Sequence, residues 1–286
     1  MSNRKILLVI HPTKPEALSF AIELARKLRG EGFTVLSQYS GSFSLNEEIA
    51  PLDTLEAVEL VVVLGGDGTI LRAAETIRGH EIPILGINMG NVGFLAEIDR
   101  PSIATVVDAI STKRYAGESR LFLKYEVVRD GAVVESGWAL NEITIGRHDA
   151  QLIELFVQID GRPLSRWGCD GVIAATPTGS TAYAFSAGGP VVWPEVNAII
   201  FLPLAAHALY SRPMVISPDS TIAIDIESHR GDLSADGMRT CALIVGDRVS
   251  ITQDHSSIEL MHLDEATFTD RLVAKFKLPI EGWRGE

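Results

Sequence analysis

The stretch VVVLGGDGTILRAAE, residues 61–75, decides the fold of the first third of the chain. Its apolar start predicts a buried strand, and the residues from Thr69 onward predict a helix. Between them lies the turn GGDG, residues 65–68. A glycine turn before a helix suits an anion, because free backbone N–H groups and the helix dipole both favour negative charge there. The carboxylate of Asp67 inside this turn therefore needs its own explanation.

Two interpretations of Asp67 are open. The turn lacks the Lys-Ser/Thr pair of a Walker A loop, and Leu71 stands where a dinucleotide fingerprint needs a small residue. Asp67 could simply cap the helix. Alternatively, it accepts a proton from a hydroxyl that attacks a phosphate held nearby, as the catalytic aspartate of a kinase does. The glycines would then let the substrate approach, and Asp67 would be the general base.

The N-terminal part alternates between strand and helix patterns, which predicts a parallel sheet with right-handed crossovers. Ligands bind beyond the carboxyl ends of strands in such sheets, where GGDGT and NMGNVGFL (residues 88–95) both fall. Phe94 in the second loop belongs either to the core or to a cleft wall. The predicted strands are 5–12, 33–37, 59–64 and 82–88, and the predicted helices are 15–29, 69–78 and 101–111.

From about Leu121 the pattern changes to period two, with hairpin signals at residues 129–131 and 160–161. The last segment, FTDRLVAKFKLP, is helical, and we expect it to dock on the first domain. The fold class is thus a Rossmann-like α/β domain (1–115 with 264–286) plus a β-rich domain (116–263), two-domain α+β overall. Later strands are predicted over 214–217, 220–227, 241–252 and 256–263, and the apolar face of the last helix carries Phe268, Leu272, Val273 and Phe276.

Two further motifs carry polar groups in the β-rich part. In residues 169–190, CDGVIAATPTGSTAYAFSAGGP, a strand leads through a turn at 176–179 into a short helix over 180–187. Its hydroxyls and Tyr183 could bind a ribose and stack a base, or the stretch could be a plain glycine-rich connection. Asn141-Glu142 interrupts a strand, and because adjacent residues point to opposite faces, one of them faces inward or into a cleft. A surface bulge is the alternative.

Composition narrows the classes of partner. The chain has 25 Lys and Arg against 37 Asp and Glu, a formal net charge of −12, and no basic block offsets it. We therefore expect no nucleic acid and no membrane partner. Two cysteines in 286 residues indicate no disulfide framework and a reducing, cytoplasmic location. The seven histidines lack paired ligand spacing, so we predict no protein-bound metal.

Together, GGDGT, NEI at Asn141 and TPTGSTAY at Thr176 resemble the NAD kinase family, in this order and at these separations. The resemblance covers nearly the whole chain, and the WALNE and GWRG stretches are similar to actinobacterial members. It implies an α/β domain, a β-rich domain, an active site between them, and a homo-oligomer, either dimer or tetramer. The implied reaction is phosphorylation of the 2′-hydroxyl on the adenosine ribose of NAD, which gives NADP. The implied donor is ATP with its Mg²⁺, or polyphosphate.

The resemblance also assigns residues by position. Asp67 matches the general base, Gly68 its neighbour at the ribose, Arg72 a basic position that could meet phosphate, and Phe94 the hydrophobic edge of the pocket. Asn141 and Glu142 match the pair that holds NAD through its ribose. The remaining matches, at the NAD site and the wall around base and ribose, are Asp170, Thr181, Ala182, Tyr183 and Ser186.

Two other functions compete with this one. Lipid kinases of the diacylglycerol and sphingoid type share GGDGT, but they must meet a membrane, and the chain has neither a basic amphipathic helix nor an exposed apolar hook. A non-catalytic dinucleotide sensor could keep NEI and TPTGSTAY while Asp67 only caps its helix. Turnover distinguishes the sensor from the enzyme.

Overall fold

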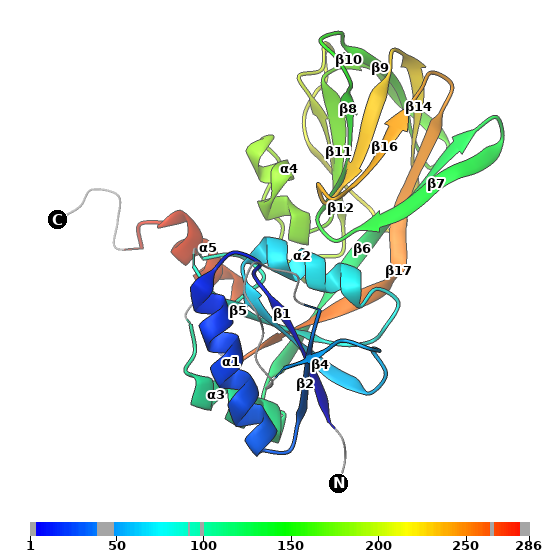
Figure 1. The fold of residues 1–286 in the computed structure, drawn as a ribbon. Coiled ribbons are helices and arrows are strands. Elements are labelled where there is room, and N and C mark those ends of the chain that lie inside the picture. Colours follow the sequence, from blue (N-terminus) through cyan, green and yellow to red (C-terminus); the bar gives the residue numbers. More distant parts are fainter. Residues whose placement is uncertain (1–3, 39–48, 91, 98–99, 264–265, 281–286) are drawn as a thin grey trace. The chain divides into compact units, whose positions relative to one another are not determined.

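The computed structural model describes residues 4–38, 49–90, 92–97, 100–263 and 266–280 (Figure 1). The chain divides into two compact units, which we call unit 1 (Met1–Ser119 with Ile258–Glu286) and unit 2 (Arg120–Ser257). Two long strands, β6 (Ala116–Arg129) and β17 (Arg248–His262), have residues in both units. Each unit is described by itself.

Unit 1 is built on a parallel sheet, as its runs of buried aliphatic residues predict. The order is β5-β4-β1-β2-β3, and the end of β17 pairs in parallel with β5 through Leu260 and Met261. Every pairing among these strands is parallel. The strands are β1 (Lys5–Ile10), β2 (Thr34–Ser37), β3 (Ala50–Pro51), β4 (Val58–Gly65) and β5 (Ile84–Asn88).

Helices cover this sheet. The side chains of α1 (Pro15–Gly30) and α3 (Ile103–Thr112) share one core with β1, β4 and β5, and the two helices contact each other (Figure 1). Helix α2 (Asp67–Thr76) packs on β4, β1 and β5, with Ile70 directed at Gly86. It begins two residues before the predicted start, because the amides of Thr69 and Ile70 already bond to the Gly66 carbonyl.

The last helix, α5 (Phe268–Phe276), belongs to unit 1. Thr267 and Asp270 form a capping box at its start, which satisfies two backbone donors reciprocally. Its predicted apolar face is only partly buried. The fully buried side chain of this helix is instead that of Arg271, 2% exposed, which no apolar periodicity indicates.

Unit 2 contains two antiparallel arrangements of strands that share one apolar core, with Trp167 and Phe201 among its large members. A six-stranded sheet has the order β13-β12-β11-β8-β15-β16, and β10-β9-β14 pair in turn with the start of β17. A hairpin joins β6 to β7. The remaining strands are β7 (Ala132–Ala139), β8 (Glu142–Arg147), β9 (Ile153–Ile159), β10 (Arg162–Cys169), β11 (Gly171–Ala175), β12 (Ile199–Leu204), β13 (Met214–Ile216), β14 (Ile222–Ser228), β15 (Gly231–Ala235) and β16 (Arg239–Leu243).

Both predicted hairpins are confirmed. Asp130-Gly131 and Asp160-Gly161 have positive φ at both positions, as a two-residue type I′ turn requires. The prediction of two strands over 241–252 and 256–263 is wrong, because β17 is continuous from Arg248 to His262. Its exposed polar middle, residues 255–257, resembles a turn in sequence but stays extended where the strand passes from one unit to the other. Strand β15 was not predicted.

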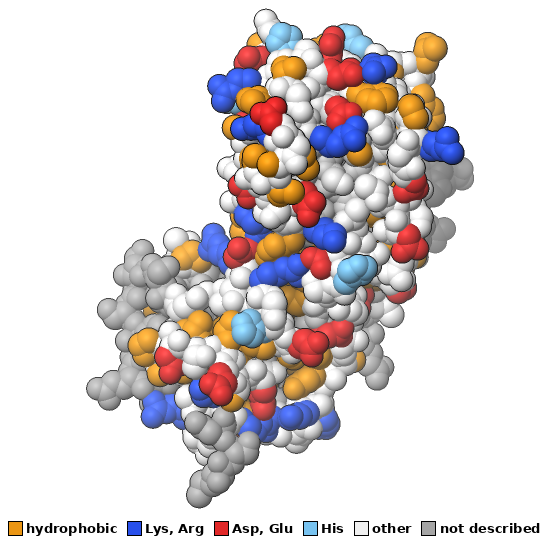
Figure 2. Space-filling view, turned by 90° about the vertical axis from the view of Figure 1, so that its right-hand side faces the viewer, with side chains coloured by type: hydrophobic (Ala, Val, Ile, Leu, Met, Phe, Trp, Pro, Cys, Tyr) orange, Lys and Arg blue, Asp and Glu red, His pale blue; other side chains and the backbone are white. Residues whose placement is uncertain are grey.

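The surface carries charges of both signs. On the face in Figure 2, Lys and Arg side chains are interspersed with Asp and Glu rather than gathered into one basic patch. In the part of the chain that the structure describes, no helix combines the length and apolarity needed to cross a bilayer.

Candidate active site

In unit 1, Asp67 is the first residue of α2, and its carboxylate contacts a different loop. Oδ2 accepts a hydrogen bond from the Phe94 amide at 3.0 Å, and Oδ1 accepts one from the Leu95 amide at 3.2 Å. Both bonds come from the loop after β5 rather than from the amides of α2. The carboxylate is therefore held in a fixed orientation at the carboxyl end of the parallel sheet.

Glycine is required beside this carboxylate. A Cβ atom on Gly93 would lie 2.1 Å from Asp67 Oδ1, and one on Gly65 would lie 2.3 Å from the Thr69 hydroxyl oxygen. Asp67 is half-buried and Gly68 is exposed. A carboxylate has about four acceptor positions, so the two accepted hydrogen bonds leave Asp67 able to accept a further hydrogen bond.

Basic side chains lie near the same end of the sheet. Arg72 is exposed on α2, and Lys14 Nζ donates to the Met89 carbonyl at 2.9 Å. The pKa of His11, just after β1, is lowered by partial burial and then by the positive charges of Lys14 and Arg72. The sequence analysis named Arg72 but not His11 and Lys14. These two residues lie near Arg72 only because β1 and β4 are neighbours in the sheet.

Phe94 is 5% exposed, and its ring centroid lies 5.8 Å from those of both Phe268 and Phe276. The structure thus places Phe94 in the core of unit 1, which is one of the two predicted alternatives. A role at the edge of a substrate pocket stays a prediction.

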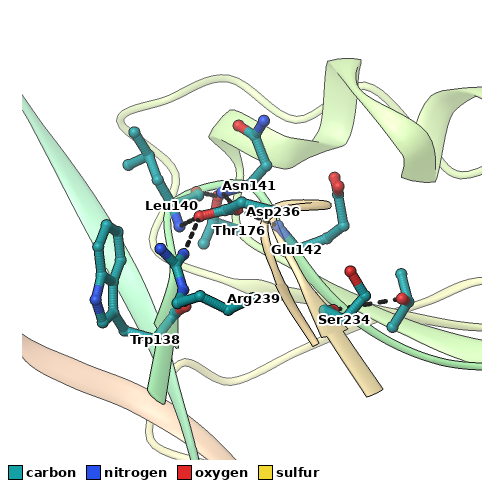
Figure 3. Close-up of polar contacts among 9 residues, drawn as sticks. Trp138, Leu140, Asn141, Glu142, Thr176, Ser234, Asp236 and Arg239 are labelled. Carbon is teal, nitrogen blue, oxygen red and sulfur yellow. Dashed lines mark hydrogen bonds and ion pairs between the residues drawn. The ribbon is translucent and has the colours of Figure 1, made fainter. Parts of the chain in front are cut away.

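In unit 2, a buried aspartate shapes the corner that carries Asn141 and Glu142. Its oxygens accept hydrogen bonds from the amides of Leu140, Asn141 and Glu142 at 2.9, 2.7 and 3.3 Å (Figure 3). This aspartate is Asp236, in the turn between β15 and β16. The strand is interrupted at this corner, as predicted, because β7 ends at Ala139 and β8 begins at Glu142. Glu142 is buried, which fits the predicted inward-facing member of the pair rather than a surface bulge.

Asp236 also forms an ion pair with the guanidinium of Arg239. Arg239 Nη2 donates to its Oδ2 at 2.9 Å, Arg239 Nε donates to the Trp138 carbonyl at 3.2 Å, and the guanidinium stacks 4.0 Å from the Trp138 ring centroid (Figure 3). Burial raises the pKa of Asp236, while the amide donors and Arg239 lower it. Sequence reasoning missed Asp236, although the Asp-Gly pair at 236–237 is a turn signal.

The TPTGSTAY segment is fastened to the same corner. Thr176 Oγ1 donates to the Leu140 carbonyl at 2.6 Å, and the Thr176 amide donates to the Asn141 carbonyl at 2.9 Å. A Cβ atom on Gly179 would lie 2.0 Å from the Asn141 carbonyl oxygen. Glycine at this position therefore lets the two segments approach.

The single helix predicted over 180–187 is wrong. A 3₁₀ turn, η1 (Thr178–Thr181), and a short helix, α4 (Tyr183–Ser186), are separated by Ala182, whose φ of −100° and ψ of −125° lie outside the helical region. Thr181 and Ala182 are half-buried, whereas Ser186 is exposed and Tyr183 is 47% exposed. These four predicted residues thus lie at or next to the interruption between η1 and α4.

Glu142 is buried, 8% exposed, and its Oε2 has no hydrogen-bond partner among the described residues. Burial raises the pKa of Glu142 to about 7, helped by the charge of Asp236 and opposed by the amide of Tyr183. A carboxyl group with a free acceptor therefore faces the start of α4.

Asp170 lies apart from this group. It precedes β11, whereas Thr176 follows it, so the strand separates them by about 20 Å at 3.3 Å per residue. Asp170 Oδ1 instead forms an ion pair with Arg147 Nε at 2.6 Å. Within unit 2, the structure does not bring Asp170 together with Glu142 and Tyr183.

Glu142 gives the first testable prediction. Because its folded-state pKa is raised from 4.5 to about 7, the stabilisation present below pH 4.5 is lost as the pH rises through 7. The free energy of unfolding should fall over this range by on the order of 3 kcal/mol from this group. Urea unfolding of Glu142→Gln at pH 5 and pH 8 should show a much smaller difference than wild type, whereas Glu154→Gln, at an exposed carboxylate, should behave as wild type. An unchanged pH dependence in Glu142→Gln would contradict the assignment.

Comparisons with known proteins cover both units. The family model described as ATP-NAD kinase N-terminal domain matches residues 6–115, and the ATP-NAD kinase C-terminal domain model matches residues 140–263. The chain is 45% identical to NAD kinase 2 of Streptomyces avermitilis, over 99% of this chain and 97% of the relative.

Two solved structures are also similar. Yeast NADH kinase complexed with NADH has a TM-score of 0.88 at 25% identity, covering all of this chain and 90% of the other. An NAD kinase from Archaeoglobus fulgidus in complex with ATP has a TM-score of 0.71 at 26% identity, covering 96% and 100%.

The α/β unit and the β-rich unit match the two domains of one family of phosphotransferases. Both family models and a relative matched over its full length agree on the type of kinase. The chain belongs to the NAD kinase family, and it is an ATP-dependent NAD kinase. The resemblance stated from the sequence is confirmed. No cluster of three His, Cys, Asp or Glu side chains able to hold a metal occurs among the described residues.

Proposed function

We propose that the enzyme transfers the γ-phosphoryl group of ATP to the 2′-hydroxyl of the adenosine ribose of NAD, with Asp67 as general base. The observation that carries this proposal is the Asp67 carboxylate, which the amides of Phe94 and Leu95 orient and which has acceptor positions left for a substrate hydroxyl. It lies where ligands bind in open α/β sheets. The related A. fulgidus enzyme has a structure with ATP, and the yeast enzyme has one with NADH.

In this reaction the 2′-oxygen attacks the γ-phosphorus while its proton moves to Asp67. The bond from the γ-phosphorus to the bridging oxygen breaks, and ADP leaves with that oxygen. Mg²⁺ arrives with ATP and neutralises charge on the phosphates. Arg72 and Lys14 add positive charge at this end of the sheet, which favours the phosphate chain.

We assign recognition of NAD to the corner in unit 2. The unpartnered Oε2 of Glu142 and the side chain of Asn141 accept ribose hydroxyls, and exposed Tyr183 offers a face for the base. Stacking of a base on an aromatic ring contributes about 1 to 3 kcal/mol. Thr181, Ala182 and Ser186 form the wall beside it, and Asp170 is assigned to the NAD site by position only.

The test is incubation with NAD, Mg²⁺ and either ATP or polyphosphate, with NADP detected by an NADP-specific dehydrogenase. NADP formation with ATP is the expected result, and the polyphosphate reaction shows whether this donor is also used. Binding of NAD without turnover would instead support the sensor alternative. Light scattering on the same sample tests the proposed dimer or tetramer.

A further inference from the structure

The loop that holds Asp67 is itself held by helix α5. This loop, residues 92–96, follows β5, and two of its amides donate to the Asp67 carboxylate. The opposite side of the loop faces α5, which lies more than 170 residues further along the chain. The orientation of Asp67 therefore depends on a helix far from the GGDGT motif in sequence.

Four residues of α5 contact the loop, at three separate points. Lys275 Nζ donates to the Val92 carbonyl at 2.6 Å, at one end of the loop. The rings of Phe268 and Phe276 both lie 5.8 Å from that of Phe94. Arg271 Nη1 donates to the Ala96 carbonyl at 2.5 Å, at the other end. The amides that bind Asp67, those of Phe94 and Leu95, lie between these fastened ends.

Of these contacts, the one made by Arg271 should add least to the free energy of unfolding. Its guanidinium is buried, and desolvation of a buried charge commonly offsets the interactions it gains. Its second nitrogen, Nη2, lies 2.9 Å from His262 Nδ1, and buried Glu97 lies 3.4 Å from the same His262 nitrogen. An apolar side chain of similar volume could fill the space of Arg271. It could not donate a hydrogen bond to the Ala96 carbonyl, as Arg271 does.

We propose that Arg271 is a positioning residue for phosphoryl transfer, which acts by fixing the loop at Ala96 so that the Phe94 and Leu95 amides orient the Asp67 carboxylate. This inference rests on the proposed role of Asp67 as general base. A displacement of about 1 Å in a catalytic group can cost on the order of 100-fold in rate. Loss of the Arg271 contact should therefore lower kcat more than it changes the KM for NAD.

The test uses the full-length enzyme with Arg271→Met, which keeps the volume and removes the donors, and with Arg271→Lys, which keeps one charged donor. Arg271→Met should lower kcat about 10- to 100-fold and change the KM for NAD by less than about threefold. Arg271→Lys should recover part of the loss. Thr269→Ala, at an exposed position of the same helix, should match wild type.

A double-mutant cycle with Asp67→Asn separates positioning from general destabilisation. If Arg271 acts through Asp67, Arg271→Met should lower kcat by less than about twofold when Asp67→Asn is already present, because residues that act as a unit are non-additive. An equal loss in both backgrounds, or wild-type kcat in folded Arg271→Met, would overturn the proposal. Wild-type kcat in Asp67→Asn alone would overturn the base assignment and this inference with it.

Lys275→Ala keeps the inference testable if Arg271→Met does not fold. Lys275 is exposed, so its truncation should leave the melting temperature nearly unchanged. It removes the contact to Val92 at the other end of the same loop. A loss of kcat of a few fold that disappears in the Asp67→Asn background would support positioning of the loop by α5, and an additive loss would refute it.

Discussion

Replacing Asp67 with asparagine should lower kcat by a factor of about 100 to 10,000, the usual contribution of a general base, while the Kd for NAD stays within about twofold. Asparagine has the same shape but accepts no proton from the ribose hydroxyl. Its amide can also accept only one of the two bonds from Phe94 and Leu95, so one amide loses its partner. Steady-state kinetics and calorimetric titration with NAD measure the two quantities separately.

The matched control is Glu75→Gln, a neutralised carboxylate exposed on the same helix. It should retain wild-type kcat, which shows that charge on α2 alone does not explain the loss. An Asp67→Asn enzyme as fast as wild type would remove the base assignment. A variant that instead lost NAD affinity with little change in kcat would indicate that Asp67 binds the substrate only.

Replacing Asp236 with alanine should destabilise unit 2 by about 3 to 5 kcal/mol, the usual cost of breaking a buried ion pair by removing one partner. Its carboxylate is inaccessible to solvent and accepts bonds from the amides of residues 140–142 and from Arg239. All four donors would lose that acceptor. Because the same amides position Asn141 and Glu142, the affinity for NAD should fall as well.

Urea unfolding and NAD titration measure these two effects. Asp236→Asn, which keeps the shape and one acceptor, should lose less than Asp236→Ala. Asp232→Ala serves as control, since Asp232 lies on neighbouring β15 in a half-exposed pair with His148 and should lose less than about 1 kcal/mol. If Asp236→Ala unfolds at the same urea concentration as wild type, the corner does not depend on this carboxylate.

The predictable part of the fold is local in sequence. The buried run before GGDGT indicates β4, and the Asp-Gly pairs at 130 and 160 indicate two hairpins, because turn chemistry acts over two to four residues. The interruption of the strand at Asn141 is also local, since polar residues interrupt an apolar pattern there, and the roles assigned to Asn141 and Tyr183 stay predictions. Fold class follows from these elements, and the comparisons confirm it.

The residues that support the site were not predictable in this way. Asp236 is 95 residues from Asn141, and Arg271 is 175 residues from Ala96. Neither interrupts a periodic pattern in a manner that distinguishes it from a solvent-exposed charge. Likewise, helix propensity indicates neither the non-helical backbone of Ala182 nor the close approach of Gly179 to the Asn141 carbonyl. Such contacts exist only once distant strands have paired.

The place of α5 along the chain has a consequence during translation. Unit 1 contains both the GGDGT turn and α5, yet all of unit 2 is encoded between them. A nascent chain that has just emerged from the ribosome with its first hundred residues lacks the helix that fastens the Asp67 loop. The Asp67 carboxylate, our proposed base, can therefore reach its final orientation only after all of unit 2 has been synthesised.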